Sequence, residues 1–81
     1  MPRRDRQVTV LGRRDCHLCE LAALDVARIA GDLGVSWEYR DITDDRELMA
    51  EHGEQVPVIL VDGQQHDFWH VDEARLRAAL R

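Results

Sequence analysis

The two cysteines of the chain, Cys16 and Cys19, stand three positions apart in the segment Cys16-His17-Leu18-Cys19. An apolar run ends at Leu11 and helical periodicity begins at Leu18, so the pair is predicted to lie on a strand-to-helix turn. The first N–H groups of a helix lack intrahelical partners and carry partial positive charge, which stabilises a nearby thiolate. The spacing therefore predicts dithiol–disulfide exchange, in which Cys16 attacks a substrate disulfide and Cys19 resolves the mixed disulfide.

Charged residues on either side of Cys16 are expected to act on its thiolate in opposite directions. As an imidazolium, His17 would stabilise the neighbouring thiolate, and we predict a modest electrostatic role for it. An exposed His17 without a chemical role is the alternative interpretation. Asp15 opposes the effect because it places negative charge beside Cys16. The pattern predicts a reactive pair but leaves the acidity of Cys16 open.

A metal site is the main alternative chemistry for this pair. The candidate ligands are the residues with sulfur or nitrogen donors, Cys16, His17, Cys19, His52, His66 and His70. Tetrahedral zinc sites usually present two clusters of ligands, and only one cysteine pair is present here. We therefore expect no resident metal and a redox-active disulfide in place of a cofactor, with His52 and His66 at the surface. A non-catalytic binding module, in which the cysteines have no role, is a further alternative.

Composition argues against several classes of protein. The 81 residues include 16 acidic residues and 11 basic ones, all arginine, for a formal net charge of −5. A basic face would be expected of a nucleic-acid-binding protein, whereas the arginines near the N-terminus are interpreted as a solvated polar arm over residues 1–6. No apolar run approaches the roughly 18 residues of a membrane span, and no signal-peptide core is recognisable. We expect a cytoplasmic monomer with one domain over residues 7–81.

Hydrophobic periodicity predicts the order β-α-β-α-β-β-α. Strands are predicted at residues 7–11, 35–42, 56–61 and 64–69, and helices at 18–33, from a Thr43 or Asp44 cap to Gly53, and from an Asp72 cap over 72–81. Gly34 is expected to end the first helix and Gly53 to end the second in a left-handed conformation. Asp62-Gly63 is typical of a tight hairpin turn.

The same patterns predict which faces are buried. Residues 56–61 form a nearly continuous apolar run, which is typical of a central strand covered on both faces. Trp37 and Tyr39 are interpreted as partly buried sheet residues. The first helix is expected to bury one stripe, made of Leu18, Ala22, Val26, Ile29 and Leu33.

The ordered combination of these features resembles a glutaredoxin. The C-x-x-C motif follows the first strand, Val56-Pro57 opens the third, Asp62-Gly63 forms the hairpin turn and a short helix ends the chain. Over residues 7–81 the sequence is similar to small glutaredoxin-like proteins with a Cys-His-Leu-Cys-type motif. The resemblance implies an α/β, thioredoxin-like fold, with a four-stranded mixed sheet flanked by three helices, and a thiol–disulfide oxidoreductase activity.

The resemblance also implies roles for individual residues. Pro57 matches the family's cis-proline that faces the active cysteines, although a trans bond is the default from the residues alone. Val56 would pair its backbone with the bound substrate. Arg13 occupies the place of a basic residue that holds the glycine carboxylate of glutathione, and Asp72 stands near the acidic pair that meets the γ-glutamyl amine.

The sequence departs from the family pattern at the glutathione site. The Gly-Gly turn of the family is replaced by Phe68-Trp69-His70-Val71, and Leu18 stands where an aromatic residue is common. Bulky side chains keep a ligand backbone further away than glycine does. We therefore expect poor glutathione binding and a protein disulfide as partner, docked in part on Trp69, with an external reductant that resets the pair. An iron–sulfur cluster shared between two chains, as some glutaredoxins hold, is a minor alternative.

Overall fold

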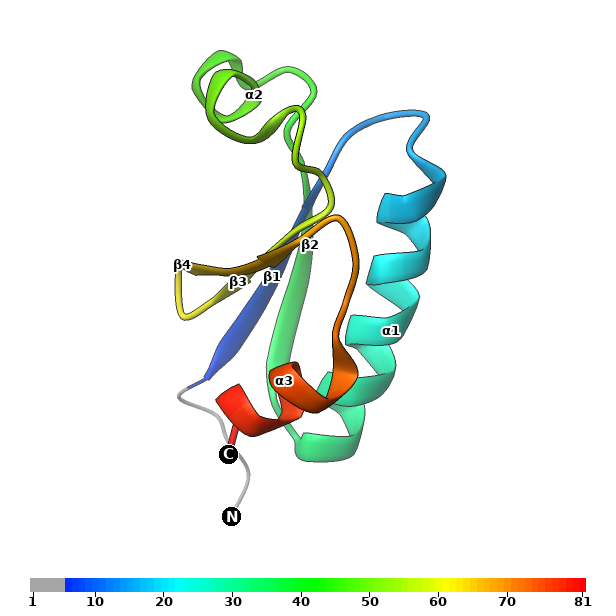
Figure 1. Ribbon diagram of the computed structural model, residues 1–81, viewed down its shortest axis with the longest axis vertical. Coiled ribbons are helices and arrows are strands. Elements are labelled where there is room, and N and C mark those ends of the chain that lie inside the picture. The colour runs from blue at the N-terminus through cyan, green and yellow to red at the C-terminus, as the bar shows by residue number, and fades with distance from the viewer. Residues whose placement is uncertain (1–5) are drawn as a thin grey trace.

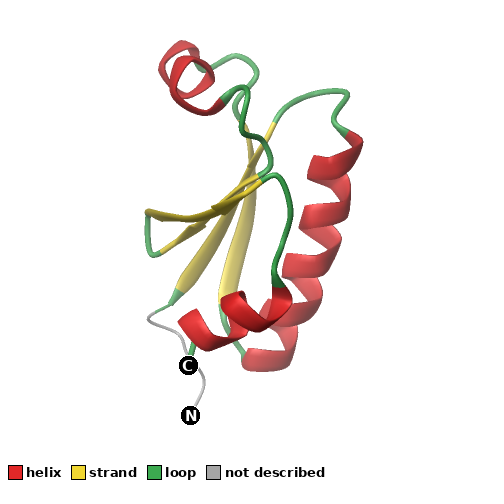
Figure 2. Ribbon diagram, in the orientation of Figure 1, coloured by secondary structure: helices red, strands yellow, loops and turns green. Residues whose placement is uncertain are grey.

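The computed structural model describes residues 6–81, so the predicted polar arm of residues 1–6 lies outside the described residues except for Arg6. The predicted element order is confirmed (Figures 1 and 2). The elements are β1 (Gln7–Gly12), α1 (His17–Leu33), β2 (Ser36–Asp41), α2 (Arg46–His52), β3 (Val58–Val61), β4 (Gln64–Phe68) and α3 (Glu73–Ala79). Within the described residues, no helix is both long enough and apolar enough to span a membrane.

The strands form one four-stranded mixed sheet, as the resemblance implies, in the order β2-β1-β3-β4. β1 and β2 are parallel, and α1 is the crossover that connects them. β3 is antiparallel to both β1 and β4. The hairpin between β3 and β4 turns at Asp62 and Gly63, whose φ values of 52° and 84° are the left-handed conformations that a tight primed turn requires.

The two faces of the sheet are covered unequally. α1 and α3 pack on one face, whereas α2 lies beyond the end at which β1 and β2 finish (Figures 1 and 2). The opposite face carries a hollow of about 510 Å³ whose lining includes Thr9, Glu38, Arg40 and Leu60. β3 is an internal strand, but the prediction that it is covered on both faces is wrong, because Leu60 and Val61 are only partly buried.

The buried stripe of α1 shares its middle residues with the predicted stripe but is rotated slightly around the helix axis. Cys19, Ala22, Val26, Ile29 and Ala30 are buried. Leu18 is 56 % exposed, so the prediction is wrong for this residue, whereas Leu33 is partly buried and packs against the core. Leu18 and Val26 are separated by slightly more than two helical turns. At 3.6 residues per turn, Leu18 therefore lies about 80° from Val26 around the helix, outside the buried stripe. Cys19 is the residue that points into the core.

Two aromatic residues of the edge strand β2 are more exposed than predicted. Trp37 and Tyr39 are 36 % and 41 % exposed. They pair with Val8 and Val10 of β1, which are fully buried under α1 and α3. Because β2 has a neighbour on one side only, its large side chains remain open to solvent at the sheet edge.

The ends of α1 and α2 show which capping predictions hold. Gly34 ends α1 with a φ of 67°, as predicted. The cap of α2 is Asp45 rather than Thr43 or Asp44, because the carboxylate of Asp45 accepts the Leu48 N–H. Gly53 is right-handed, with a φ of −54°, so the predicted left-handed conformation is wrong. A Cβ at this glycine would lie 2.5 Å from the Met49 carbonyl oxygen, and close approach explains the glycine.

Ion pairs join α1 to α3 around Glu73. The Arg28 guanidinium lies 2.8 Å from the Glu73 carboxylate, and the Arg77 Nε lies 2.9 Å from it. Hydrogen bonds from Arg28 and then Arg77 lower the pKa of Glu73 from 4.5 to about 2. Because the folded pKa is depressed, the contribution of this carboxylate to stability is present above pH 4.5 and is lost as the pH falls toward about 2.

We expect Glu73→Gln to lower Tm at neutral pH. In acid, the Tm of this variant should approach that of the wild type. The difference in Tm should close between pH 4.5 and about 2, because the wild-type carboxylate is then protonated as well. Thermal unfolding followed by circular dichroism across this range is the measurement. Glu54→Gln is the control, since the structure gives that carboxylate no ion pair within the described residues. A Tm difference that stays constant from neutral pH down to about pH 2 would contradict the expectation.

Candidate active site

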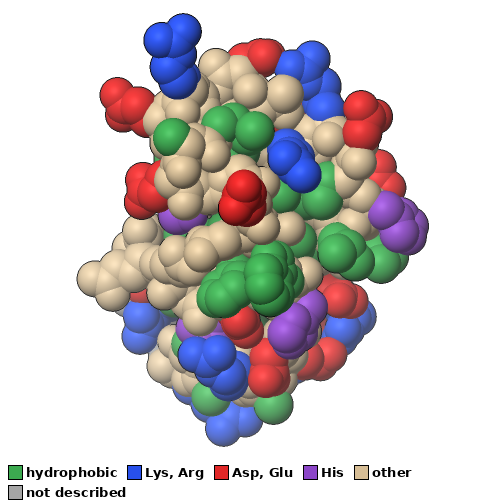
Figure 3. Space-filling model, turned by 45° about the horizontal axis from the view of Figure 1, so that its top comes forward, with side chains coloured by type: hydrophobic (Ala, Val, Ile, Leu, Met, Phe, Trp, Pro, Cys, Tyr) green, Lys and Arg blue, Asp and Glu red, His purple; other side chains and the backbone are tan. Residues whose placement is uncertain are grey.

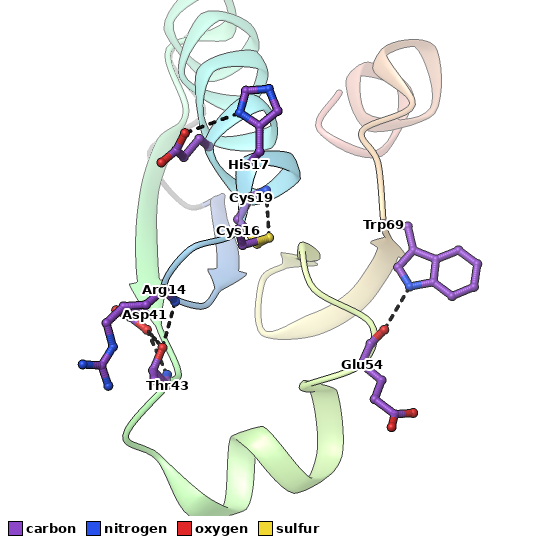
Figure 4. The surroundings of a disulfide bond; sticks show 9 residues. Arg14, Cys16, His17, Cys19, Asp41, Thr43, Glu54 and Trp69 are labelled. Carbon is purple, nitrogen blue, oxygen red and sulfur yellow. Dashed lines mark hydrogen bonds and ion pairs between the residues drawn. A yellow bond between two sulfur atoms is a disulfide. The ribbon is translucent and has the colours of Figure 1, made fainter.

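Cys16 and Cys19 form a disulfide at the start of α1 (Figure 4). Cys16 is the N-cap residue, and its extended backbone (φ −117°, ψ 100°) leads into a helix that begins at His17. The Cys19 N–H donates to Cys16 Sγ over 3.2 Å. The sulfur of Cys16 thus occupies the position at which a helix N-terminus stabilises negative charge.

The two sulfurs differ in exposure. Cys16 is partly exposed, whereas Cys19 is fully buried, and this order agrees with the predicted roles of Cys16 as the attacking thiol and Cys19 as the resolving thiol. Cys19 packs in a small apolar cluster at this end of the sheet, formed with Leu11, Ile42, Val56 and Val58. A reagent from solvent can therefore reach Cys16, while Cys19 is shielded on the protein side.

The Val56–Pro57 peptide bond is cis, as the resemblance implies. Both residues are buried, and Val56 packs in the cluster that holds Cys19. They precede the third strand instead of opening it, because β3 begins at Val58. The physical reason is that Pro57 has no N–H to donate to a strand ladder.

Trp69 links the connection between β4 and α3 to the segment that precedes Val58. Its backbone N–H donates to the Pro57 carbonyl over 2.8 Å, and its indole Nε1–H donates to the Glu54 carbonyl over 3.1 Å (Figure 4). Phe68 contacts the indole edge to face, with ring centroids 5.0 Å apart. The strand predicted to reach Trp69 ends at Phe68 because Trp69 is left-handed, with a φ of 72°.

The conformation of Trp69 is uncommon for a bulky residue. From the sequence, Phe68 and Trp69 could either form a platform for a partner or pack within the hairpin, and the structure separates the two residues. Phe68 is partly buried against the Cys19 cluster, whereas the Trp69 side chain is 56 % exposed. Trp69 also lines a small groove of about 160 Å³ together with Leu18 and Leu21 of α1. Apolar side chains and histidines lie next to one another on this part of the surface (Figure 3).

A larger hollow of about 580 Å³ lies on the other side of Cys16. Its lining includes Arg13, Leu24 and Tyr39, so the structure brings Arg13 and Cys16 to the same hollow. The pKa of Tyr39 is raised, first by burial and then by the negative charges of Asp41 and Glu20.

His17 and Asp72 have partners of their own. His17 is exposed on the first turn of α1, with Nδ1 3.6 Å from a Glu20 carboxylate oxygen (Figure 4). Asp72 caps α3, as predicted, and its carboxylate accepts the Arg75 N–H over 3.1 Å.

The histidines considered as metal ligands are distributed differently from the prediction. His52 is only 8 % exposed, so the expectation that it lies at the surface is wrong, whereas His66 remains partly exposed. His52 ends α2 and is covered where that helix meets the sheet. Over residues 6–81 the structure shows no group of three or more His, Cys, Asp or Glu side chains arranged to hold a metal ion.

Sequence reasoning missed one set of contacts at the site. Thr43 was considered only as a helix cap, yet its hydroxyl accepts the backbone N–H of Arg14, two residues before Cys16. Asp41 in turn accepts the Thr43 hydroxyl and its N–H. The sequence signal was an aspartate followed two residues later by a threonine, a pattern typical of side-chain turns.

Known proteins match the chain over nearly its whole length. The family described as glutaredoxin-like domain (DUF836) matches residues 7–81. An uncharacterised protein of Mycobacterium tuberculosis is 39 % identical over 77 residues, which cover 89 % of this chain and 79 % of that protein. An X-ray structure of a protein from X. campestris is 34 % identical with a TM-score of 0.72, and the match covers 90 % of this chain and 93 % of that one.

A more distant structure shares the fold alone. A mutant thioredoxin from Halobacterium salinarum is 21 % identical with a TM-score of 0.66, and the match covers 95 % of this chain and 73 % of the thioredoxin. These similarities agree with the mixed sheet, the three helices and the cysteine pair described above.

Proposed function

The chain belongs to the glutaredoxin-like domain (DUF836) family, and from this premise we propose that it is a thiol–disulfide oxidoreductase acting by dithiol–disulfide exchange. One observation carries the proposal. A partly exposed cysteine caps α1 and is joined to a fully buried cysteine one turn further along the helix. A purely structural crosslink over so short a loop would add little stability.

The proposed reaction transfers two electrons from the cysteine pair to a substrate disulfide. The Cys16 thiolate attacks one substrate sulfur, the substrate S–S bond breaks, and the departing thiolate takes up a proton. Cys19 then loses its proton and attacks Cys16 Sγ, which releases the second substrate thiol and forms the Cys16–Cys19 disulfide. An external dithiol or pair of thiols reduces this disulfide by the reverse sequence.

The surroundings of the two sulfurs support this division of roles. A thiolate at Cys16 would accept the Cys19 N–H and would lie at the positive end of the α1 dipole. Cys19 is covered by the small apolar cluster that includes Leu11 and Val58. The neighbouring Cys16 sulfur is therefore the group that reaches it most easily. Exposed His17 adds a positive charge near the site when it is protonated.

We further propose that the substrate is a protein disulfide. Trp69, Leu18 and Leu21 are exposed apolar side chains around a groove beside the first turn of α1, and they suit an extended polypeptide. Arg13 would contact a carboxylate of the partner and the Val56 backbone would meet its main chain. Glutathione is expected to bind poorly, because bulky residues replace the Gly-Gly turn of the family and the left-handed position is held by Trp69.

The test is turnover of a protein disulfide, compared with a glutathione mixed disulfide, with glutathione or thioredoxin reductase as the reductant system. Trp69→Ala is expected to raise KM for the protein disulfide several-fold with little change in kcat, because it removes docking surface and leaves the sulfurs in place. Trp69→Gly should have the same effect while relieving the positive φ.

Trp37→Ala is the matched control, since Trp37 is also exposed but pairs with Val8, away from the disulfide end of the sheet. Fast turnover of the glutathione mixed disulfide that is unaffected by Trp69→Ala would overturn the assignment of a protein substrate. Slow turnover of both substrates with both reductants would favour a binding module instead of an enzyme.

A further inference from the structure

The loop from Gly12 to Cys16 is held by the connection between β2 and α2. The Ile42 N–H donates to the Gly12 carbonyl over 2.8 Å, at the start of the loop. Two residues further on, the Arg14 N–H donates to Thr43 Oγ1 over 2.9 Å (Figure 4). The Arg14 guanidinium donates to Asp44 over 2.8 Å. The loop that carries Cys16 is therefore anchored from outside its own strand and helix.

The Thr43 hydroxyl is the centre of this anchor. It donates to Asp41 Oδ1 over 2.6 Å, and the Thr43 N–H donates to the same oxygen over 2.9 Å. With its proton directed to Asp41, the hydroxyl presents a lone pair to the Arg14 N–H. These bonds from Thr43 lower the pKa of Asp41, so its carboxylate is charged at neutral pH and fixes the direction of the hydroxyl.

The anchored residue determines where the helix begins. Asp15 lies between Arg14 and Cys16 and is left-handed, with a φ of 59°, a conformation that aspartate tolerates better than most residues. The chain turns there, and Cys16 then takes the extended N-cap conformation that directs its sulfur to the Cys19 N–H. A shift of Arg14 would therefore be passed through one residue to the Cys16 sulfur.

We propose that Thr43, oriented by Asp41, is a positioning residue that holds the Cys16 sulfur at the N-terminus of α1 and thereby sets how readily the disulfide is reduced. The inference rests on the proposed function for its biological meaning. In the oxidised protein the Cys16–Cys19 bond itself holds the sulfur, whereas in the reduced protein the sulfur is held by the loop and by the Cys19 N–H, which the loop directs it toward. Loss of the anchor therefore weakens the reduced thiolate state more than the disulfide state.

The experiment measures the equilibrium in which the protein disulfide and two glutathione molecules give the protein dithiol and glutathione disulfide. Thr43→Val keeps the shape of the side chain but removes the hydroxyl. We expect it to shift this equilibrium about three- to tenfold toward the protein disulfide, which at tenfold is about 30 mV more negative. The alkylation rate of Cys16 at pH 7 should fall by a similar factor.

Thr43→Ser is the matched control, because it restores the hydroxyl and should stay within about twofold of the wild type. Asp41→Asn leaves Thr43 in place but removes the charge that orients its hydroxyl. It should shift the equilibrium in the same direction as Thr43→Val, and it replaces Thr43→Val as the test if that variant does not fold. Wild-type equilibria in Thr43→Val or Asp41→Asn, or a shift in Thr43→Ser as large as in Thr43→Val, would overturn the inference.

These readouts separate the inference from the proposed function. The glutathione equilibrium and the alkylation rate do not require turnover of a protein substrate. A protein that fails to catalyse exchange but shows the Thr43→Val shift would contradict the proposed function alone. A catalyst whose equilibrium and alkylation are insensitive to Thr43→Val would contradict the positioning role alone.

Discussion

Cys16→Ser is expected to abolish disulfide exchange, whereas Cys19→Ser is expected to retain the first step and to accumulate mixed disulfides. A serine hydroxyl at the N-cap remains protonated at neutral pH and cannot attack a disulfide, so turnover should fall at least about a thousandfold. Cys19→Ser leaves the exposed nucleophile in place but removes the sulfur that displaces the partner. The bond between Cys16 and the substrate then persists.

Mass spectrometry of the intact protein after reaction with a protein disulfide distinguishes these outcomes. Cys19→Ser should carry one covalently attached partner, released by reductant, and Cys16→Ser should carry none. Both serine variants lose the disulfide, so they are a matched pair for any change in stability. Adducts on Cys16→Ser, formed through Cys19, would reverse the assigned roles of the two sulfurs.

Ile29→Ala is expected to lower the free energy of unfolding by about 2 to 5 kcal/mol. Ile29 is fully buried in the main core, where α1 packs against β1, β3 and α3. Truncation removes apolar contacts and leaves a cavity that a close-packed core cannot fill. This loss is a large share of the roughly 5 to 15 kcal/mol that stabilises an ordinary domain.

Leu24→Ala in the same helix is the control, because Leu24 is 69 % exposed. It should change stability by no more than about 0.5 kcal/mol. Denaturant unfolding of the oxidised proteins gives both values. A larger loss for Leu24→Ala than for Ile29→Ala would mean that α1 is rotated from its described orientation, with Leu24 rather than Ile29 in the core.

Local signals in the sequence were sufficient for the order of the elements and for several turns and caps. The Asp62-Gly63 turn, the Gly34 end of α1 and the Asp72 cap of α3 were each predicted, because a turn or a cap depends on a few adjacent residues. The position of Cys16 before a helix could be predicted for the same reason.

Predictions failed where the answer depended on distant parts of the chain. Periodicity placed Leu18 in the buried stripe of the first helix, but the packing of α1 on the sheet leaves Leu18 56 % exposed. The burial of His52 and the open face beside β3 follow from the place of α2 at the end of the sheet, which no local pattern encodes.

The sequence by itself determined which residues can react, and the tertiary structure decided what holds them in place. The left-handed Trp69 is held by carbonyls of Glu54 and Pro57, and the loop before Cys16 is held by Thr43. Each of these contacts joins segments that are far apart in the sequence. Their formation depends on the register of the sheet and the packing of α1, because hydrogen bonds of this kind require donor and acceptor to be brought within about 3 Å by the rest of the fold.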